Sequence, residues 1–200
     1  MRDLQLIVFD WGNVLVRYRP LGFVRLAQVL GAPLNDVVDA FMADGLFSAL
    51  QVGQAGSAAL VGRLADRFGV AVRPEVLVAC FEEDMAEPMP GMRALVEQLR
   101  GQVPLALLSN TFFAHWELVL QDRFYQAFEH RIGSHIVGAC KPEAAVFAAL
   151  ERRSQVPPDR VLFFDDSPRH VAAARAWGWD AHVFRDAAQV AECIGRHLAK

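Results

Sequence analysis

Leu4-Gln-Leu-Ile-Val-Phe9, followed at once by Asp10-Trp-Gly-Asn13, is the stretch that decides how this chain folds. Residues 4–9 form an almost unbroken apolar run that is too short for a surface helix, which predicts a strand buried on both faces. Gly12-Asn13 favours a sharp turn directly after it. A carboxylate at the carboxyl end of a buried parallel strand stands where open α/β sheets hold their ligands. Asp10 is therefore a candidate functional residue, although taken alone it could equally cap the turn.

The next part of the chain, from Pro20 to about Met85, changes to a helical pattern without repeats. Apolar residues recur there at helical spacing in four places. The four helices are expected around Leu26, Val37, Leu64 and Leu77. Ser57 is the expected N-cap of the third helix. We therefore predict that residues 17–86 form a small helical domain inserted after the first strand.

From Pro88-Met-Pro-Gly91 onward, apolar strands alternate with helices, which indicates an α/β fold with a doubly wound parallel sheet. The strands are expected at 105–108, 132–137, 161–164 and 181–184. The helices are expected at about 92–100, 115–128, 141–150, 167–177 and 187–198. Pro142 is expected in the first turn of its helix. Residues 1–16 and 87–200 then form one core domain.

Composition excludes several classes of function. The chain has 200 residues and a net charge of −3 with scattered basic residues, so no nucleic-acid partner is expected. It has no run of 18 or more apolar residues and no signal-peptide pattern, so no membrane association is expected. Cys80, Cys140 and Cys193 are far apart and odd in number, which predicts ordinary thiols and a cytoplasmic location. A monomer or a homodimer is compatible with this composition.

Polar side chains follow three of the predicted strands, and Lys141 opens a helix near the same edge. Asp10, Ser109-Asn110 and Asp165-Asp166 stand at the strand ends. Singly, each could cap a helix or, for the lysine, face solvent. Together, two carboxylates about 4 Å apart repel by roughly 4 kcal/mol at an effective dielectric near 20. Mg²⁺ relieves such repulsion and suits carboxylates, phosphate and water, while backbone N–H groups and a hydroxyl hold a phosphate.

With these motifs in order, the sequence resembles the haloacid dehalogenase superfamily of aspartate-nucleophile phosphohydrolases over its whole length. The motifs are Phe-Asp10-Trp-Gly-Asn-Val-Leu, Leu-Leu-Ser109-Asn-Thr, Lys141-Pro-Glu and Phe-Phe-Asp165-Asp166-Ser. The helical insert corresponds to the family's small α-helical cap. Among the branches, the motifs are most similar to sugar-phosphate phosphatases of the α-D-glucose-1-phosphate phosphatase kind.

The resemblance implies roles for individual residues in a Mg²⁺-dependent phosphatase that acts on a small phosphorylated metabolite. Asp10 would be the nucleophile that forms an aspartyl-phosphate, and Lys141 would bridge this carboxylate and the phosphate. Mg²⁺ would be bound by Asp10, the Gly12 carbonyl and Asp166, with Asp165 binding the ion or its water. The phosphate-binding residues would be Trp11, Gly12, Ser109, Asn110 and Lys141.

The sequence departs from the family pattern two positions after Asp10, where Gly12 replaces the usual aspartate that protonates the leaving group. Such groups contribute about 10²–10⁴ in rate. The enzyme could be slow, or Arg17, Tyr18 or Arg19 could assist. Otherwise the substrate has a good leaving group, which predicts a preference for sugar 1-phosphates over 6-phosphates. Gln51 and His170 also depart from the usual residues, and His170 is interpreted mainly as a structural histidine.

Two other functions compete with the phosphatase. A metal-free 2-haloacid dehalogenase also lacks the second aspartate, although those enzymes lack paired acids such as Asp165-Asp166. The remaining alternative is a weakly active binding or regulatory protein on the same fold, which Gly12 favours.

Overall fold

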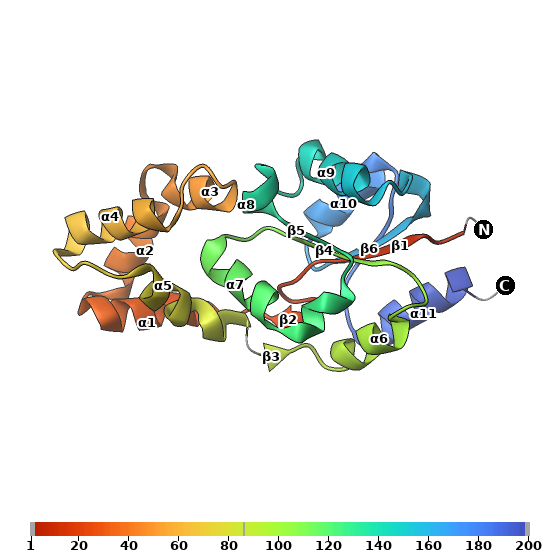
Figure 1. Ribbon diagram of the computed structural model, residues 1–200, viewed down its shortest axis with the longest axis horizontal. Helices are drawn as coiled ribbons and strands as arrows, with labels where there is room; N and C mark the ends of the chain where they lie inside the picture. The colour runs from red at the N-terminus through yellow and green to blue at the C-terminus, as the bar shows by residue number, and fades with distance from the viewer. Residues whose placement is uncertain (1–2, 86, 199–200) are drawn as a thin grey trace.

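The structure, a computed structural model, describes residues 3–85 and 87–198 and has a five-stranded parallel sheet at its centre within these residues (Figure 1). The strands lie in the order β5-β4-β1-β6-β7. Their bounds are Leu6–Phe9 for β1, Leu105–Ser109 for β4, His130–Gly133 for β5, Val161–Asp165 for β6 and Asp180–Val183 for β7. The predicted α/β fold with a doubly wound parallel sheet is confirmed, and β1 is its central strand.

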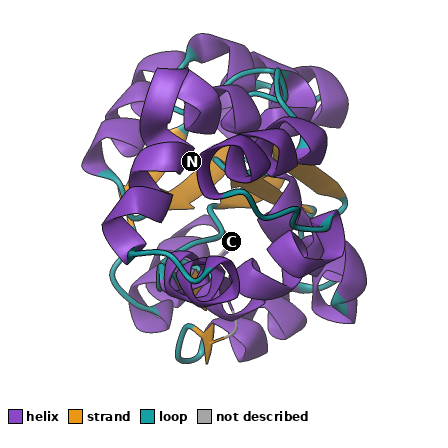
Figure 2. Ribbon diagram, turned by 90° about the vertical axis from the view of Figure 1, so that its left-hand side faces the viewer, coloured by secondary structure: helices purple, strands orange, loops and turns teal. Residues whose placement is uncertain are grey.

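Helices cover both faces of the sheet (Figure 2). One face packs against α6 (Met92–Leu99), α7 (Phe113–Gln121) and α11 (Ala187–Leu198), and the other against α9 (Ala144–Ser154) and α10 (Pro168–Trp177). Along β1, Ile7 and Phe9 enter the first layer, whereas Leu6 and Val8 enter the second. All four are fully buried, and burying a side chain of this size contributes about 1.5–3 kcal/mol.

A helical layer lies beyond the carboxyl ends of the strands, and we call it the cap (Figure 1). It consists of α1 (Leu21–Leu30), α2 (Leu34–Met42), α3 (Leu46–Gln51), α4 (Ser57–Phe68) and α5 (Pro74–Phe81), with the 3₁₀ turns η1 (Ala43–Gly45) and η2 (Glu82–Met85). The two connections to the core pair as a short antiparallel ribbon of β2 (Val16–Arg17) and β3 (Glu87–Pro88). The sequence-based boundaries between core and cap, at 16/17 and 86/87, remain a proposal. The ribbon supports it, because the two connections pair there.

The cap is packed tightly against the core. Phe112, which precedes α7, lies in the same apolar cluster as the cap residues Phe41 and Phe81. Its ring centroid is 5.4 Å from that of Phe81 and 6.4 Å from that of Phe41. On the other side, a Cβ atom at Gly53 would lie 2.0 Å from the carbonyl oxygen of His135, so only glycine allows this approach. None of the described helices combines the length and hydropathy needed to cross a bilayer.

Several local predictions are wrong. Residues 134–137 do not continue a strand but form the short helix α8 (Ser134–Val137), which ends at Gly138 in the left-handed conformation. Pro142 precedes helix α9, whose N-cap position is Glu143, and the Lys141–Pro142 bond is cis. Ser57 is the first helical residue after the N-cap Gly56, with no side-chain cap.

Two further elements lie outside the sequence-based prediction, namely the ribbon of β2 and β3 and the six-residue helix α3. They are too short to show a period in the sequence.

The remaining short turns are the 3₁₀ segments η3 (Arg123–Ala127), within the region predicted as helical, and η4 (Pro158–Arg160), which leads into β6.

Candidate active site

Three neighbouring strands end in polar residues at the edge of the sheet that faces the cap. Asp10 follows β1 directly, Ser109 ends β4 and Asp165 ends β6. Because β4, β1 and β6 are adjacent and parallel, their carboxyl ends meet. Asp10 and Ser109 are 8% and 3% exposed, and Asp165 is fully buried. The structure therefore brings together the strand-end residues that the sequence singles out.

Lys141 places a buried ammonium group between two of these carboxylates. Its Nζ lies 2.8 Å from Oδ1 of Asp10 and 2.6 Å from Oδ2 of Asp165, and its side chain is fully buried. Burial lowers the pKa of Lys141, but the charges of Asp10 and Asp165 raise it above its usual value. The lysine therefore stays charged and holds the two carboxylates together.

The two carboxyl groups respond differently to this environment. Burial raises the pKa of Asp10 to about 7, and the negative charge of Asp165 adds to this effect while Lys141 opposes it. Burial also raises the pKa of Asp165, but Lys141 and a hydrogen bond from His170 outweigh it and bring the pKa to about 2. Without a further cation, Asp10 is thus the carboxylate whose ionised form is least stabilised.

Asn110 positions the backbone of Lys141. Its Nδ2 donates to the carbonyl of Lys141 at 2.8 Å, and its Oδ1 accepts from the amide of Lys141 at 2.7 Å. These two bonds hold the side chain of Asn110 against the backbone of Lys141, and no described residue accepts from the backbone N–H of Asn110. The Ser109 hydroxyl makes no hydrogen bond to any described residue and lines the cavity above the strand ends.

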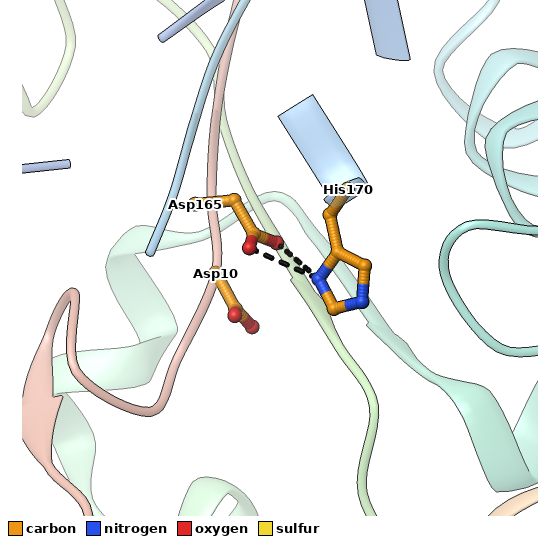
Figure 3. A group of neighbouring side chains, drawn as sticks. All are labelled: Asp10, Asp165 and His170. Atoms are coloured by element: carbon orange, nitrogen blue, oxygen red, sulfur yellow. Dashed lines mark hydrogen bonds and ion pairs between the residues drawn. The ribbon is translucent and has the colours of Figure 1, made fainter. Parts of the chain in front are cut away.

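Both carboxylate oxygens of Asp165 have partners, and Figure 3 shows the contact with His170. Its Oδ1 accepts from the backbone N–H of Ser167 at 2.8 Å and lies 3.0 Å from Nδ1 of His170, while its Oδ2 contacts Lys141. His170 therefore has a definite partner at the site. Both oxygens of Asp165 therefore have partners, and Asp165 holds the ammonium group of Lys141 in position.

Asp166 stands in a different environment from Asp165. It is exposed and lines the cavity, and its Oδ2 accepts from Nδ2 of Asn13 at 3.0 Å. Asn13 has a φ of 57° and also accepts from the amide of Tyr18 at 3.1 Å through Oδ1. The first turn after β1 thus holds the last motif in place.

The oxygen atoms at this edge fit a hard divalent cation. Asp10 and Asp166 supply carboxylates, and no described residue donates to the carbonyl oxygen of Gly12. A carboxylate oxygen of Asp10, a carboxylate oxygen of Asp165 and a ring nitrogen of His170 also lie within 4.8 Å of one another. Since Asp165 and His170 are bonded to each other and Mg²⁺ prefers oxygen ligands, Asp10, Gly12 and Asp166 are the better set.

Trp11 contacts Asp10 through its backbone, and Gly12 lines the cavity. The indole of Trp11 is fully buried in the core and donates from Nε1 to the hydroxyl of Tyr125 at 2.6 Å. Its backbone N–H donates to Oδ1 of Asp10 at 2.7 Å. A Cβ atom at Gly12 would meet Tyr18 and Met85 at an ordinary 3.6 Å. The structure therefore accommodates a Cβ atom at the position where the acid is missing.

A cavity of about 340 Å³ lies between the strand ends and the cap. Asp10, Ser109 and Asp166 form its polar floor. Its upper wall is mostly aromatic and consists of Tyr18, Phe23, Phe47, Phe81 and Phe112. Gln51 and His115 are further polar residues of this wall. Sequence reasoning missed His115, because it stands alone on a helix without any ligand spacing.

Fold and site together define a class of α/β enzymes in which a strand-end aspartate, a buried lysine and a late acidic pair share one sheet edge beneath a helical cap. The family model for haloacid dehalogenase-like hydrolase matches residues 4–178, and the chain belongs to this family.

Solved structures share this fold. A haloacid dehalogenase-like hydrolase from Porphyromonas gingivalis is 24% identical and superposes with a TM-score of 0.83, and the match covers 100% of both chains. A family enzyme from Bacteroides thetaiotaomicron, solved with magnesium and inorganic phosphate, is 21% identical with a TM-score of 0.80 over 94% of this chain and 98% of that one. The L-2-haloacid dehalogenase from Xanthobacter autotrophicus is 18% identical with a TM-score of 0.60 over 89% and 76%.

Proposed function

We propose that the protein is a Mg²⁺-dependent phosphatase that hydrolyses a small phosphorylated metabolite through an aspartyl-phosphate on Asp10. The observation that carries this proposal is the fully buried ammonium of Lys141 between Asp165 and Asp10, the carboxylate that lines the cavity. A cavity of this size is at the lower end of the usual range for small-molecule sites. A cytoplasmic location, and a monomeric or homodimeric state, belong to the same proposal.

The nucleophile in this proposal is Oδ2 of Asp10. The other oxygen, Oδ1, is held by Lys141 and by the amide of Trp11, whereas no described residue donates to Oδ2. Attack on phosphorus would transfer the phosphoryl group to Asp10, and water would then release it. The Ser109 hydroxyl and the Asn110 backbone N–H would hold the phosphoryl oxygens, so that catalysis rests on positioning and charge stabilisation.

Asp10, the Gly12 carbonyl and Asp166 are the proposed Mg²⁺ ligands. The bound ion would supply charge stabilisation for the phosphoryl oxygens. Together with Lys141 it would balance the three carboxylates of Asp10, Asp165 and Asp166. The Bacteroides thetaiotaomicron enzyme of the same fold, solved with magnesium and inorganic phosphate, supports magnesium as the proposed cofactor.

The experiment that tests the proposal is phosphate release from a panel of phosphorylated metabolites, with Mg²⁺ and with EDTA, by the wild type and by Asp10→Asn. We expect release that requires both Mg²⁺ and Asp10. Release by Asp10→Asn at the wild-type rate would contradict the proposal. No release by the wild type from any substrate would favour the weakly active binding protein instead.

A metal-free 2-haloacid dehalogenase is the second candidate, because the Xanthobacter autotrophicus enzyme, solved with chloropropionic acid covalently bound, shares the fold. Gly12 is compatible with it. The exposed Asp166, fixed by Asn13 beside the cavity, favours the phosphatase. Halide release from 2-chloropropionate in EDTA would support the dehalogenase.

The finer assignment to the α-D-glucose-1-phosphate phosphatase branch also remains a proposal. It predicts faster turnover of sugar 1-phosphates than of 6-phosphates, since an anomeric oxygen leaves more readily than a primary alkoxide. Equal turnover of the two would count against it.

A further inference from the structure

Gly12 leaves the site without an acid at the family's usual position, and the structure narrows the search for a replacement. Arg17 and Arg19 both pair with Glu87 on the ribbon of β2 and β3, and neither lines the cavity. Beyond Asp10 and Asp166, the titratable side chains among the described cavity residues are Tyr18 and His115.

His115 is fixed from one side by a buried carboxylate of the cap. It lies in α7 and is 6% exposed, and its Nε2 is 3.1 Å from Oδ2 of Asp84. Asp84 lies in η2 and is fully buried, and its Oδ1 accepts from the amide of Gly22 at 2.6 Å. The imidazole therefore has one defined partner and one defined orientation.

This arrangement determines which nitrogen of His115 is available. An ionised Asp84 can only accept, so Nε2 of His115 carries a proton. Nδ1 makes no hydrogen bond to any described residue. The sealed polar side-chain atoms without a partner in the described structure are Nδ1 of His135 and Nε1 of Trp179, and His115 Nδ1 is not one of them. His115 lines the cavity, and Nδ1 is the ring nitrogen that Asp84 does not hold.

The surroundings of the pair are apolar, which makes a purely structural role costly. The His115 ring lies 4.7 Å from that of Phe112 and 5.6 Å from that of Phe81, measured between centroids. Burying a carboxyl group and an imidazole among aromatic rings costs desolvation, and apolar side chains of similar volume usually stabilise such a position at least as well. A carboxylate that orients an imidazole toward a reaction cavity is, in contrast, a recurring arrangement for proton transfer.

We propose that His115 is the acid–base catalyst of this site and that Asp84 is its positioning residue; this inference rests on the phosphatase function proposed above. The cycle begins with His115 carrying a proton on both ring nitrogens. As Oδ2 of Asp10 attacks phosphorus, the bond from phosphorus to the leaving oxygen breaks, and Nδ1 of the imidazolium transfers its proton to that oxygen to give the free alcohol. Neutral His115 then accepts a proton from the water that attacks the aspartyl-phosphate. The bond from phosphorus to Asp10 breaks, inorganic phosphate leaves, and His115 is protonated again.

The test compares leaving groups in the variant His115→Gln, whose side-chain amide can still donate to Asp84. The measured quantity is leaving-group release in the first turnover, with p-nitrophenyl phosphate, phenyl phosphate and an alkyl phosphate. Nitrophenolate departs without a proton, whereas an alkoxide needs one. Without the acid, alkyl phosphate cleavage should slow about 10²–10⁴-fold while p-nitrophenyl phosphate cleavage changes by less than about 10-fold.

Two further variants complete the experiment. Gly12→Asp in the His115→Gln background places a carboxylate where Gly12 leaves room, and it should restore alkyl phosphate cleavage, which also shows that the double variant is folded. Tyr18→Phe removes the other titratable group of the cavity wall and should leave the order of the three substrates unchanged. If Tyr18→Phe instead reproduces the selective loss, the acid is Tyr18 and the assignment of His115 is wrong.

The remaining outcomes separate this inference from the proposed function. If His115→Gln slows all three substrates equally, or none of them, His115 is not the acid, and Asp10-dependent phosphate release by the wild type still stands. If the wild type itself shows no Asp10-dependent cleavage of any of the three, both the phosphatase and the role of His115 are overturned.

Discussion

Asn13 and Asp166 are joined by a hydrogen bond of 3.0 Å from Nδ2 to Oδ2, which links the turn after the first strand to the motif after β6, 153 positions later. The bond leaves Oδ1 of Asp166 without a donor among the described residues. Partners of this kind orient metal ligands, and removing them typically costs about 10–100-fold in metal affinity.

Asn13→Gly should therefore weaken Mg²⁺ activation. Glycine adopts the φ of 57° at this position freely, so the variant removes the side chain without straining the backbone. Alanine would strain it, because its Cβ disfavours this left-handed conformation. We expect the Mg²⁺ concentration for half-maximal activity to rise about 10-fold or more. The measurement is a Mg²⁺ titration of phosphate release, with Asn35→Gly, at a position in α2 outside the cavity lining, as control. An unchanged Mg²⁺ requirement would exclude Asp166 as a ligand that depends on Asn13.

The raised pKa of Asp10 makes the stability of the metal-free protein depend on pH. The native pKa is about 7 and the unfolded value 3.8, so the native state binds more protons than the unfolded state between these values. The free energy of unfolding in EDTA should therefore fall as pH rises from about 4 to 7, by a few kcal/mol.

Urea unfolding in EDTA at pH 5 and pH 8 measures this effect. Asp10→Asn has no titrating carboxyl at the position and should be less sensitive to pH over this range than the wild type. Mg²⁺ should stabilise the wild type most at pH 8, where Asp10 is ionised. If wild type and variant lose the same stability between the two pH values, Asp10 is not the titrating group.

Gly12→Asp should increase the phosphatase activity of His115→Gln rather than abolish it. The nearest atoms to a Cβ at this position, in Tyr18 and Met85, lie at 3.6 Å, which is ordinary van der Waals contact. In the His115→Gln background, a carboxyl group two positions after Asp10 could protonate the leaving group, and we expect up to about 10²-fold faster turnover of alkyl phosphates than with His115→Gln alone. Gly12→Asn, of the same size but without a proton to transfer, is the matched control. An equal effect of both variants would show that the gain comes from packing.

Much of this fold could be predicted because its central strands are uninterrupted apolar runs. The predictions for β4 and β6 each miss only the polar final residue, Ser109 and Asp165. The edge strand β5 was misplaced because it begins with the half-buried His130 and Arg131, which do not read as a buried strand. Ile136 and Val137, which the prediction places in the same strand, belong instead to the short helix α8.

The candidate site divides in the same way. Asp10, Lys141 and Asp165 could be expected to meet, since each follows or faces the end of a parallel strand. His115 and Asp84 could not, because they meet only when η2 of the cap packs against α7 of the core, and neither carries a pattern in the sequence. The two hydrogen bonds between the Asn110 side chain and the Lys141 backbone could not be predicted either, because they depend on the conformation of the loop that precedes α9.

Replacing Asn110 should therefore lower kcat and stability, whereas replacing Ser109 should mainly raise KM. Asn110→Asp keeps an acceptor for the amide of Lys141 but replaces the donor to its carbonyl with a charged oxygen, so the loop that carries Lys141 should shift. We expect kcat to fall and the free energy of unfolding to drop by about 1–3 kcal/mol, the cost of an unsatisfied buried group. Ser109→Ala removes only a hydroxyl that faces the cavity, so KM should rise while stability stays within about 0.5 kcal/mol. Steady-state kinetics and urea unfolding of the two variants measure both effects. A rise in KM alone for Asn110→Asp would instead mean that its side chain binds the phosphate directly.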